Sequence, residues 1–334
     1  MKVSGLLLAC VLTATSAACL AEPPIVIKFS HVAAFDAPKG KAAERFKKLA
    51  EEGSKGRVRV DLYPNSSLYK DKEELEALQL GAVQMLAPAP GKFGPMGVKE
   101  FEVLDLPYLF DGIASAQRVT QGPIGRQLLG KLDARGIAGL ALWDNGFRVF
   151  TSNKPIRRPA DLKGQKIRIQ SSKVTDAQMR GVGALPQVLA FGELYQALQT
   201  GVVDGQENPI THVYTQKFYE VQRYMTLTDH SYHGYVVIAN KKFWESLPPD
   251  IRKLLTSALD DTTAYFYQMA KLENDEALEA IRKIGRMEIH TPTPQEMGEW
   301  KRAFGRVHRE MEGRVGKELL ESIYKETGFD PGRP

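Results

Sequence analysis

Strand-like and helix-like segments alternate along this chain in two successive runs, and few folds accommodate that order. In the first run, "IVIKFSH" (25–31), "RVRVDLYP" (57–64) and "AVQMLAPAP" (82–90) are predicted strands, with helical segments between them. A second run begins near residue 147 and contains strand-like "GQKIRIQSS" and helix-like "GELYQALQTG". Because strands that alternate with helices form sheets covered by helices, we predict the α/β fold class.

The two runs also resemble each other in sequence. "ALQLGAV" (77–83) and "ALQTGVV" (197–203) agree at five of seven positions, and in both a helix is expected to end at glycine. Arg59 in "VRV" corresponds in the same way to Arg168 in "IRI". The length of 334 residues suits about two domains of ~150 residues each. We therefore predict two similar α/β bodies, whether or not they arose by internal duplication.

The segment 250–284 contains neither glycine nor proline, and it predicts one helix roughly 50 Å long. After Leu272 its apolar stripe moves to Leu278 and Ile281. Before that point the stripe follows Ile251, Leu255, Ala258, Thr262, Tyr265, Met269 and Leu272. A helix longer than one domain whose buried face changes partway is expected to pack on two bodies in turn. The alternative is two helices with a break near residues 273–275.

The N-terminus "MKVSGLLLACVLTATSAACLAEPP" has the pattern of a secretory signal: one lysine, an apolar run and then small residues. The apolar run is shorter than the ~20 residues that a membrane-spanning helix needs. We place cleavage after Ala21, so that residues 1–21 form the signal peptide and the mature protein is exported. The alternative is a lipoprotein processed at Cys19, although Ser16 rather than leucine stands three residues before it.

Composition excludes several classes of protein. Both cysteines, Cys10 and Cys19, lie in the leader, so the mature chain has no disulfide, no reactive thiol and no cysteine-ligated metal. The net charge of +5 is not gathered into basic runs interleaved with aromatic residues, so we expect no nucleic-acid partner. A mild positive bias favours attraction of a small anion.

Familiar catalytic and cofactor motifs are missing from the sequence. It has no GxGxxG before a helix, no P-loop, no HExxH and no GxSxG. His230 and His233 have the spacing of metal ligands, but "LTDHSYHGYVVIAN" reads as a turn that enters a strand. We therefore expect no cofactor, no metal and no enzymatic activity, and the remaining features point to a binding protein. An exported enzyme acting on carboxylates is the alternative from another class.

Arg168 is the strongest candidate for a binding residue. The polar side chains of Gln170, Ser171 and Ser172 follow it, whereas Arg59 is followed by an ordinary strand exit. A planar guanidinium meets a carboxylate through two parallel hydrogen bonds and keeps its charge when desolvated. The competing interpretation is that Arg168 points to solvent.

Further candidates surround the same predicted cleft, each with a structural alternative. Arg148 follows "WDNGF", and its alternative is a solvated arginine. Asn208 ends a strand before Pro209, at the end of the strand where ligands bind in open α/β sheets. Its alternative is a turn or N-cap residue. Ser171 could donate a hydroxyl or cap the next helix, and Phe191 could wall a cleft or belong to the core. A second cation, Arg148 or Lys39, would make the site specific for a diacid.

The phrases "KFSHVAA", "YPNSSLYKDKEELEALQLGAVQMLAP", "KFGPMGVKEFEVLDLPYLF", "GQKIRIQSSKV" and "ALQTGVVDGQENP" together resemble the solute-binding receptors of tripartite ATP-independent periplasmic (TRAP) transporters, most of all the C4-dicarboxylate-binding branch. The resemblance covers nearly the whole mature chain. It implies a type II-like periplasmic binding protein fold: a ligand cleft between two lobes, hinged strands and a long helix that spans both. It also implies delivery of an organic acid to a membrane permease with a small and a large subunit, and we expect a monomer.

The family motifs assign roles to particular residues. By resemblance Arg168 is the carboxylate anchor, Arg148 and Asn208 are ligand contacts, and Ser171, Phe191 and, more weakly, Tyr235 line the cleft. Ala89 stands where the sialic-acid branch has an acidic residue, which argues against that ligand. We place domain I at 22–145 plus about 234–272, and domain II at 146–233 plus about 273–334.

The ligand expected from the resemblance is a C4-dicarboxylate such as succinate, malate or fumarate. A sugar acid, a keto acid or an aromatic acid would suit the same class of receptor, since the sequence does not give the volume of the cleft. A sensory subunit that reports the ligand to a membrane receptor is a further alternative.

Overall fold

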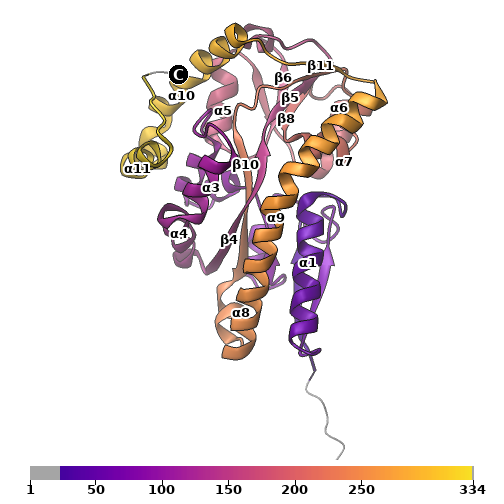
Figure 1. Ribbon diagram of the computed structural model, residues 1–334, viewed down its shortest axis with the longest axis vertical. Helices are drawn as coiled ribbons and strands as arrows, with labels where there is room; N and C mark the ends of the chain where they lie inside the picture. The colour runs from indigo at the N-terminus through magenta and orange to yellow at the C-terminus, as the bar shows by residue number, and fades with distance from the viewer. Residues whose placement is uncertain (1–22, 333–334) are drawn as a thin grey trace, which may run out of the picture.

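A computed structural model describes residues 23–332 as two β-sheets covered by helices in one elongated molecule (Figure 1). The mixed α/β architecture agrees with the predicted fold class. The predicted signal peptide, its cleavage after Ala21 and the alternative processing at Cys19 lie outside the described residues.

The first sheet has five strands and combines parallel and antiparallel pairs. Its first three strands run parallel, and the long fourth strand pairs antiparallel with both of its neighbours. Its spatial order is β2 (Val58–Tyr63), β1 (Ile25–Ser30), β3 (Met85–Leu86), β10 (Tyr232–Asn240) and β4 (Ile137–Phe147). The predicted strand at 82–90 is confined to Met85–Leu86, and on its C-terminal side Pro88 and Pro90 have no N–H to extend the ladder.

The second sheet has six strands and lies toward the other end of the molecule (Figure 1). Its spatial order is β11 (Glu288–His290), β9 (Tyr224–Thr226), β5 (Val149–Ser152), β8 (Gly205–Asn208), β6 (Lys166–Ile169) and β7 (Leu185–Val188). The chain passes between the sheets from β4 to β5 through Arg148 alone, and from β9 to β10 through residues 227–231.

Helices cover both sheets. The helices of the first half are α1 (Pro38–Gly53), α2 (Glu74–Gln79), α3 (Ile113–Gln121) and α4 (Pro123–Gly130). Those of the second half are α5 (Lys173–Gly181), α6 (Leu194–Gln199), α7 (Ile210–Thr215), α8 (Lys241–Ser246), α9 (Pro249–Ile284), α10 (Pro294–Val315) and α11 (Lys317–Thr327). Short 3₁₀ turns cover Pro90–Phe93, Lys99–Asp105, Asp133–Arg135, Pro159–Leu162, Phe191–Glu193 and Phe218–Glu220.

The helix α9 is one unbroken element of 36 residues, as predicted, and the alternative of a break near residues 273–275 is wrong. It lies beside α1 and runs from α8 toward α6 along the length of the molecule (Figure 1). Its first part packs in the core beneath the first sheet through Leu255 and Phe266, and its last part packs in the core of the second through Ile281. The helix therefore contacts both bodies in turn.

The predicted stripe on α9 is wrong at Leu272, and at Tyr265 it misses the fully buried neighbour. Leu272 is 57% exposed, and Phe266 rather than Tyr265 is fully buried, where it stacks on Trp143 with ring centres 5.1 Å apart. Strict alternation of four- and three-residue steps assumes a period of 3.5, whereas a straight helix has 3.6 residues per turn, so the buried face drifts away from the predicted stripe.

The sequence echo has a structural counterpart. Helices α2 and α6 are both six residues long, and each is followed by a glycine in the left-handed region, Gly81 with φ of 79° and Gly201 with φ of 72°. The corresponding arginines differ: Arg59 is exposed beside Asp61, whereas Arg168 is buried. The same local pattern therefore serves two different environments.

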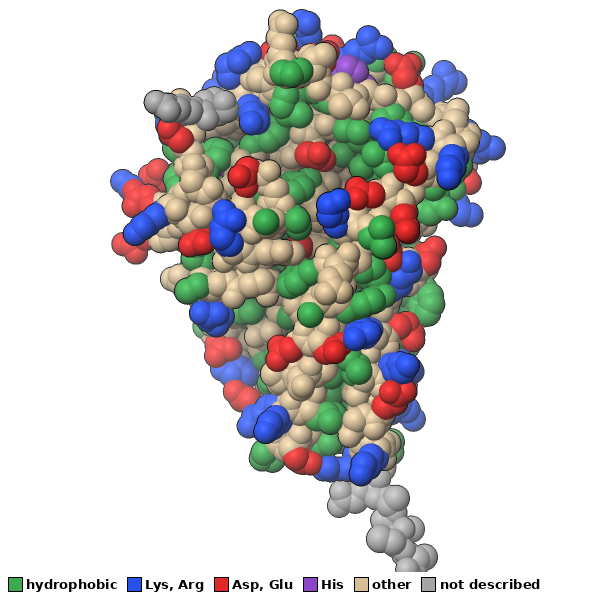
Figure 2. Space-filling view, in the orientation of Figure 1, with side chains coloured by type: hydrophobic (Ala, Val, Ile, Leu, Met, Phe, Trp, Pro, Cys, Tyr) green, Lys and Arg blue, Asp and Glu red, His purple; other side chains and the backbone are tan. Residues whose placement is uncertain are grey.

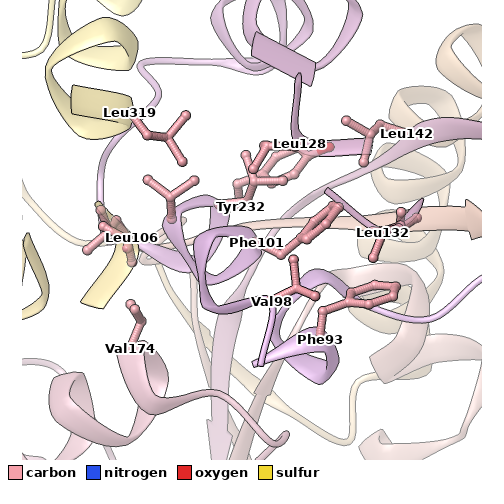
Figure 3. Packing of buried hydrophobic residues seen from close by; sticks show 14 of the residues in the cluster. Phe93, Val98, Phe101, Leu106, Leu128, Leu132, Leu142, Val174, Tyr232 and Leu319 are labelled. Atoms are coloured by element: carbon pink, nitrogen blue, oxygen red, sulfur yellow. The ribbon is translucent and has the colours of Figure 1, made fainter. Parts of the chain in front are cut away.

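The C-terminal helices connect the two halves of the chain. Leu319 on α11 packs in one apolar cluster with residues of α3 and α4, and Val174 on α5 joins that cluster from the second half. Figure 3 shows Val174 and Leu319 on either side of Leu106.

On the outer surface, basic and acidic side chains are mixed over the face in Figure 2. Among residues 23–332, no helix combines the length and apolar character needed to cross a membrane.

Candidate functional site

A cavity lies between the two bodies, lined by residues from both. It holds about 360 Å³ of space free of protein atoms, its open mouth included. Its lining residues are Val32, Ala33, Lys39, Asp71, Ala89, Lys92, Arg168, Gln170, Phe191, Asn208, His212, His233 and Tyr235. Five predicted site residues are in this set: Lys39, Arg168, Phe191, Asn208 and Tyr235.

Arg168 lies on β6 between β8 and β7 and is only 3% exposed. The interpretation that it points to solvent is therefore wrong. Its Nε and Nη2 donate hydrogen bonds of 3.0 and 2.8 Å to the carbonyl oxygen of Leu189. A guanidinium has five N–H donors, so three remain for a ligand while Leu189 fixes the plane of the group. Burial acts to lower the pKa of Arg168, but arginine remains charged in proteins.

Lys39 is held in the first turn of α1, which begins with proline at Pro38. Its Nζ donates a 2.9 Å hydrogen bond to the carbonyl of Ala87 and lies 3.9 Å from the centre of the Tyr235 ring. Burial, assisted by the charge of Lys92, lowers the pKa of Lys39 to about 7. An arriving anion would favour the protonated form of this group.

Lys92 sits between two carboxylates in the 3₁₀ turn Pro90–Phe93. Its Nζ donates a short hydrogen bond to Asp71 and a 2.8 Å hydrogen bond to Glu74. Burial acts to lower the pKa of Lys92, but these two acidic partners outweigh it and raise the pKa. Lys92 is therefore a fixed positive charge in the wall of the cavity.

Two neutral histidines and Tyr235 form the polar back of the cavity. The hydroxyl of Tyr235 lies 2.6 Å from Nε2 of His212, and burial lowers the pKa of His212 to about 3. Burial also lowers the pKa of His233, so both imidazoles are neutral near pH 7. Among the described residues, Nδ1 of each ring has no hydrogen-bond partner, which leaves two buried polar atoms for a ligand or water.

Arg148 lies outside the set of lining residues, at the crossing from β4 to β5. Its Nη1 donates to both carboxylate oxygens of Glu207 at 2.6 and 2.8 Å, and its Nη2 donates to Asp105 at 3.1 Å. All three side chains are almost fully buried, and His230 Nε2 lies 3.7 Å from Glu207. Arg148 is thus committed to an ion-paired cluster and is not a solvated arginine, and its Nε has no partner among the described residues.

The remaining predicted residues are placed as follows. Ser171 does not line the cavity, and the interpretation that it caps α5 is wrong because the side chain of Ser172 accepts the hydrogen bond from Thr175 N. Asn208 ends β8 and is not the N-cap of α7, a position that Pro209 occupies. Phe191 lines the cavity and also packs against the Phe218 ring, so it serves both the wall and the core.

Sequence reasoning missed Asp71, Lys92, Gln170, His212 and His233 as lining residues. A usable signal existed for Lys92, since "GK" directly follows the predicted strand 82–90 of the first run, just as "GQENP" ends a strand in the second. The carboxyl ends of strands from two similar bodies are expected to face the same cleft. Asp71 carried no such signal, because it lies in a loop.

The charges around the cavity favour an acidic ligand. Lys39, Lys92 and Arg168 line it as cations, whereas Asp71 is the single acidic side chain in the lining. Apolar surface comes from Val32, Ala33, Ala89 and Phe191. Within residues 23–332, no three His, Cys, Asp or Glu side chains are grouped so that they could hold a metal ion. A small cavity with excess positive charge between two lobes defines a receptor for a small organic anion.

Comparison with known proteins identifies the class. The family of bacterial extracellular solute-binding proteins, family 7, matches residues 29–314, and this chain belongs to that family of TRAP transporter receptors. The resemblance stated from the sequence is thereby confirmed.

Individual relatives are similar over nearly their whole length. The C4-dicarboxylate-binding periplasmic protein DctP of Rhodobacter capsulatus is 54% identical over 314 residues, 94% of each chain. A TRAP solute-binding protein of Shewanella oneidensis with bound succinate superposes with a TM-score of 0.89 at 39% identity, covering 91% of this chain and 99% of that one. One of Pseudomonas aeruginosa with bound L-malate gives a TM-score of 0.84 at 38% identity, covering 86% and 100%.

Proposed function

We propose that this receptor captures a C4-dicarboxylate such as succinate, malate or fumarate and delivers it to a TRAP permease with a small and a large subunit. The observation that carries the proposal is the cavity wall, in which three cations face one carboxylate. Because Lys92 is already paired with Asp71 and Glu74, Lys39 and Arg168 supply the positive charge left for a ligand, one cation for each carboxylate of a dianion. Relatives whose names or bound ligands are C4-dicarboxylates support the same ligand class.

In the proposed complex Arg168 binds one carboxylate through two parallel hydrogen bonds from its free N–H groups. Lys39 and Lys92 attract the second carboxylate, and Asn208 and Tyr235 offer hydrogen bonds to the body of the ligand. Phe191 supplies apolar contact. Arg148 and Ser171 remain predicted ligand contacts. Neither lines the cavity, so each would have to move toward the ligand to contact it.

The lobe boundaries remain part of the proposal, with 22–145 and about 234–272 in one lobe and 146–233 and about 273–334 in the other. Each sheet draws its strands from one of these sets, apart from two residues at the end of β4 and two at the start of β10, which supports the division. The contact of α11 with α3 and α4 then joins the lobes through residues that do not line the cavity. Capture and release require a hinge, for which the crossings at Arg148 and residues 227–231 are the candidates.

We also propose that the receptor works as a periplasmic monomer after removal of residues 1–21, and that it carries out no chemistry on its ligand. Mass determination of the exported protein gives the cleavage site, and light scattering gives the oligomeric state. Conversion of any ligand that stabilises the protein would contradict the absence of catalysis.

Thermal unfolding with a panel of acids tests the ligand class. Succinate, L-malate and fumarate should each raise the unfolding temperature, since a ligand at 100 times its Kd stabilises by ~2.7 kcal/mol. Butyrate, which lacks the second carboxylate, is the matched control and should give a much smaller rise. Stabilisation by galactonate or an aromatic acid, with none by the three dicarboxylates, would refute the proposal. Loss of succinate uptake on deletion of the permease genes would separate a transport receptor from a sensory subunit.

A further inference from the structure

Asp71 lines the cavity and joins the two bodies. It belongs to the loop that precedes α2 in the first body, and its side chain is 10% exposed. One carboxylate oxygen accepts the hydrogen bond from Lys92 Nζ, also in the first body. The other oxygen, Oδ2, accepts a 2.5 Å hydrogen bond from the backbone N–H of Phe191 in the second body. The carboxylate therefore bridges the bodies.

The same few residues connect Asp71 to the predicted anchor. Arg168 donates to the carbonyl of Leu189, and two residues later the N–H of Phe191 donates to Asp71. Arg168 Nη2 lies 3.9 Å from Asp71 Oδ2, too far for a hydrogen bond, so the guanidinium keeps its free donors. The segment 189–191 is thus fixed by Arg168 on one side and by Asp71 on the other.

We infer that Asp71 is a positioning residue that holds the two lobes together over the bound ligand, without contacting the ligand itself. The inference deepens the proposed function, on which its ligand-binding arm rests. Each oxygen of the carboxylate already accepts a hydrogen bond within the protein, one from Lys92 and one from Phe191. The bridge exists only when the lobes meet, so it stabilises the closed arrangement for every ligand alike.

Electrostatics supports a permanent charge on this bridge. Burial acts to raise the pKa of Asp71, but the charges of Lys92 and Arg168 and the two hydrogen bonds outweigh burial and lower it to about 2. The carboxylate is therefore ionised at any pH at which the protein works. A hydrogen bond to a charged group is stronger than one between neutral groups.

Substitution of Asp71 removes the acceptor of the Phe191 N–H but leaves Lys92 paired. Lys92 retains its 2.8 Å hydrogen bond to Glu74, so Asp71→Ala leaves no isolated buried charge. A matched control lies in the same two loops, where Lys70 and Glu193 form an ion pair of 3.2 Å between exposed side chains. Exposed pairs contribute little, so Glu193→Gln should behave like the natural protein.

The first arm of the test measures the distance between the lobes without ligand. The mature chain has no cysteine, so Glu76→Cys and Gln199→Cys, both at exposed positions, allow spin labels on α2 and α6. Asp71→Ala should shift the distance distribution toward larger separations, and Glu193→Gln should not. An unchanged distribution in Asp71→Ala would overturn the inference, whatever the ligand proves to be.

The second arm measures binding of succinate and L-malate by calorimetry and stopped flow. Asp71→Ala should weaken both ligands by the same factor, about tenfold to a hundredfold, as expected for one charge-assisted hydrogen bond, and mainly through faster dissociation. Asp71→Asn keeps an acceptor oxygen, so its affinity for each ligand should lie between those of the natural protein and of Asp71→Ala. A change in the ratio of the two affinities would show direct ligand contact and refute the inference, as would unchanged affinity. If neither acid binds the natural protein, the proposed function fails while the distance arm still decides the role of Asp71.

Discussion

Arg168 is oriented by Leu189: two of its N–H groups converge on one carbonyl oxygen at 3.0 and 2.8 Å. The guanidinium plane is therefore set by the backbone of the neighbouring segment before any ligand arrives. Such preorganisation lowers the entropic cost of binding, because the long side chain has no rotamers left to lose.

Replacing Arg168 should weaken ligand binding, and more so when both its charge and its donors are removed than when its charge is kept. Arg168→Ala should weaken succinate binding by on the order of 3–5 kcal/mol, at least a hundredfold, because a buried carboxylate loses its partner. Arg168→Lys keeps the charge but not the planar pair of donors and should still lose about tenfold or more. Calorimetry measures both, and Arg59→Ala, at the exposed corresponding position, is the control. Near-natural affinity in Arg168→Ala would refute the anchor role.

Lys39 should make ligand binding depend on pH above neutrality. Its pKa of about 7 means that it is largely neutral at pH 8.5, and a bound dianion should raise that pKa and draw in a proton. Affinity should therefore be full below pH 7 and fall as the pH rises through the pKa of the complex. The neighbouring histidines titrate far below this range and do not contribute.

Calorimetry at pH 8.5 in buffers of different ionisation enthalpy should show uptake of up to one proton per ligand. At pH 6, where Lys39 is already protonated, uptake at this group should vanish. Lys39→Met should bind more weakly and without the proton uptake. Equal uptake in Lys39→Met would assign the proton to another group.

Local patterns predicted most elements, because strand and helix periodicities are properties of a few neighbouring residues. The contrast between Arg59 and Arg168 also predicted the anchor candidate, since the residues that follow each arginine differ. The Lys92–Asp71–Phe191 bridge was out of reach, because its partners are far apart in sequence and meet only through packing of the two bodies. The shortened β3 was missed for a local reason, the two prolines that follow it.

Arg148 should be needed for stability whatever its part in binding. Its loss leaves Glu207 and Asp105 buried without their cation, which typically costs 3–5 kcal/mol. Arg148→Met should therefore unfold at a temperature lower by on the order of 10 °C. Arg282→Met, which removes an exposed pair with Glu279, should change it little. The same variants measured with succinate test the predicted ligand contact. If Arg148 contacts the ligand, Arg148→Met should also reduce the rise in unfolding temperature that succinate causes.

Asn274 should stabilise the junction of the two bodies from the C-terminal third of α9. Its Nδ2 donates to the carbonyl of Asn145 at 3.0 Å, and its Oδ1 accepts from the N–H of Thr211 at 3.2 Å, which links the helix to the end of β4 and to α7. Asn274→Leu leaves both backbone groups without this partner and should lower the free energy of unfolding by about 1–3 kcal/mol. Leucine has the higher helix propensity, so propensity alone predicts the opposite sign.

Denaturant unfolding decides between the two effects. Asp275→Leu, one residue along the same helix, removes only an exposed pair with Lys271 and should be neutral or slightly stabilising. If Asn274→Leu proved as stable as Asp275→Leu, the two backbone links would carry no weight. The passage of α9 between the bodies would then rest on its apolar contacts alone, Phe266 on one side and Ile281 on the other.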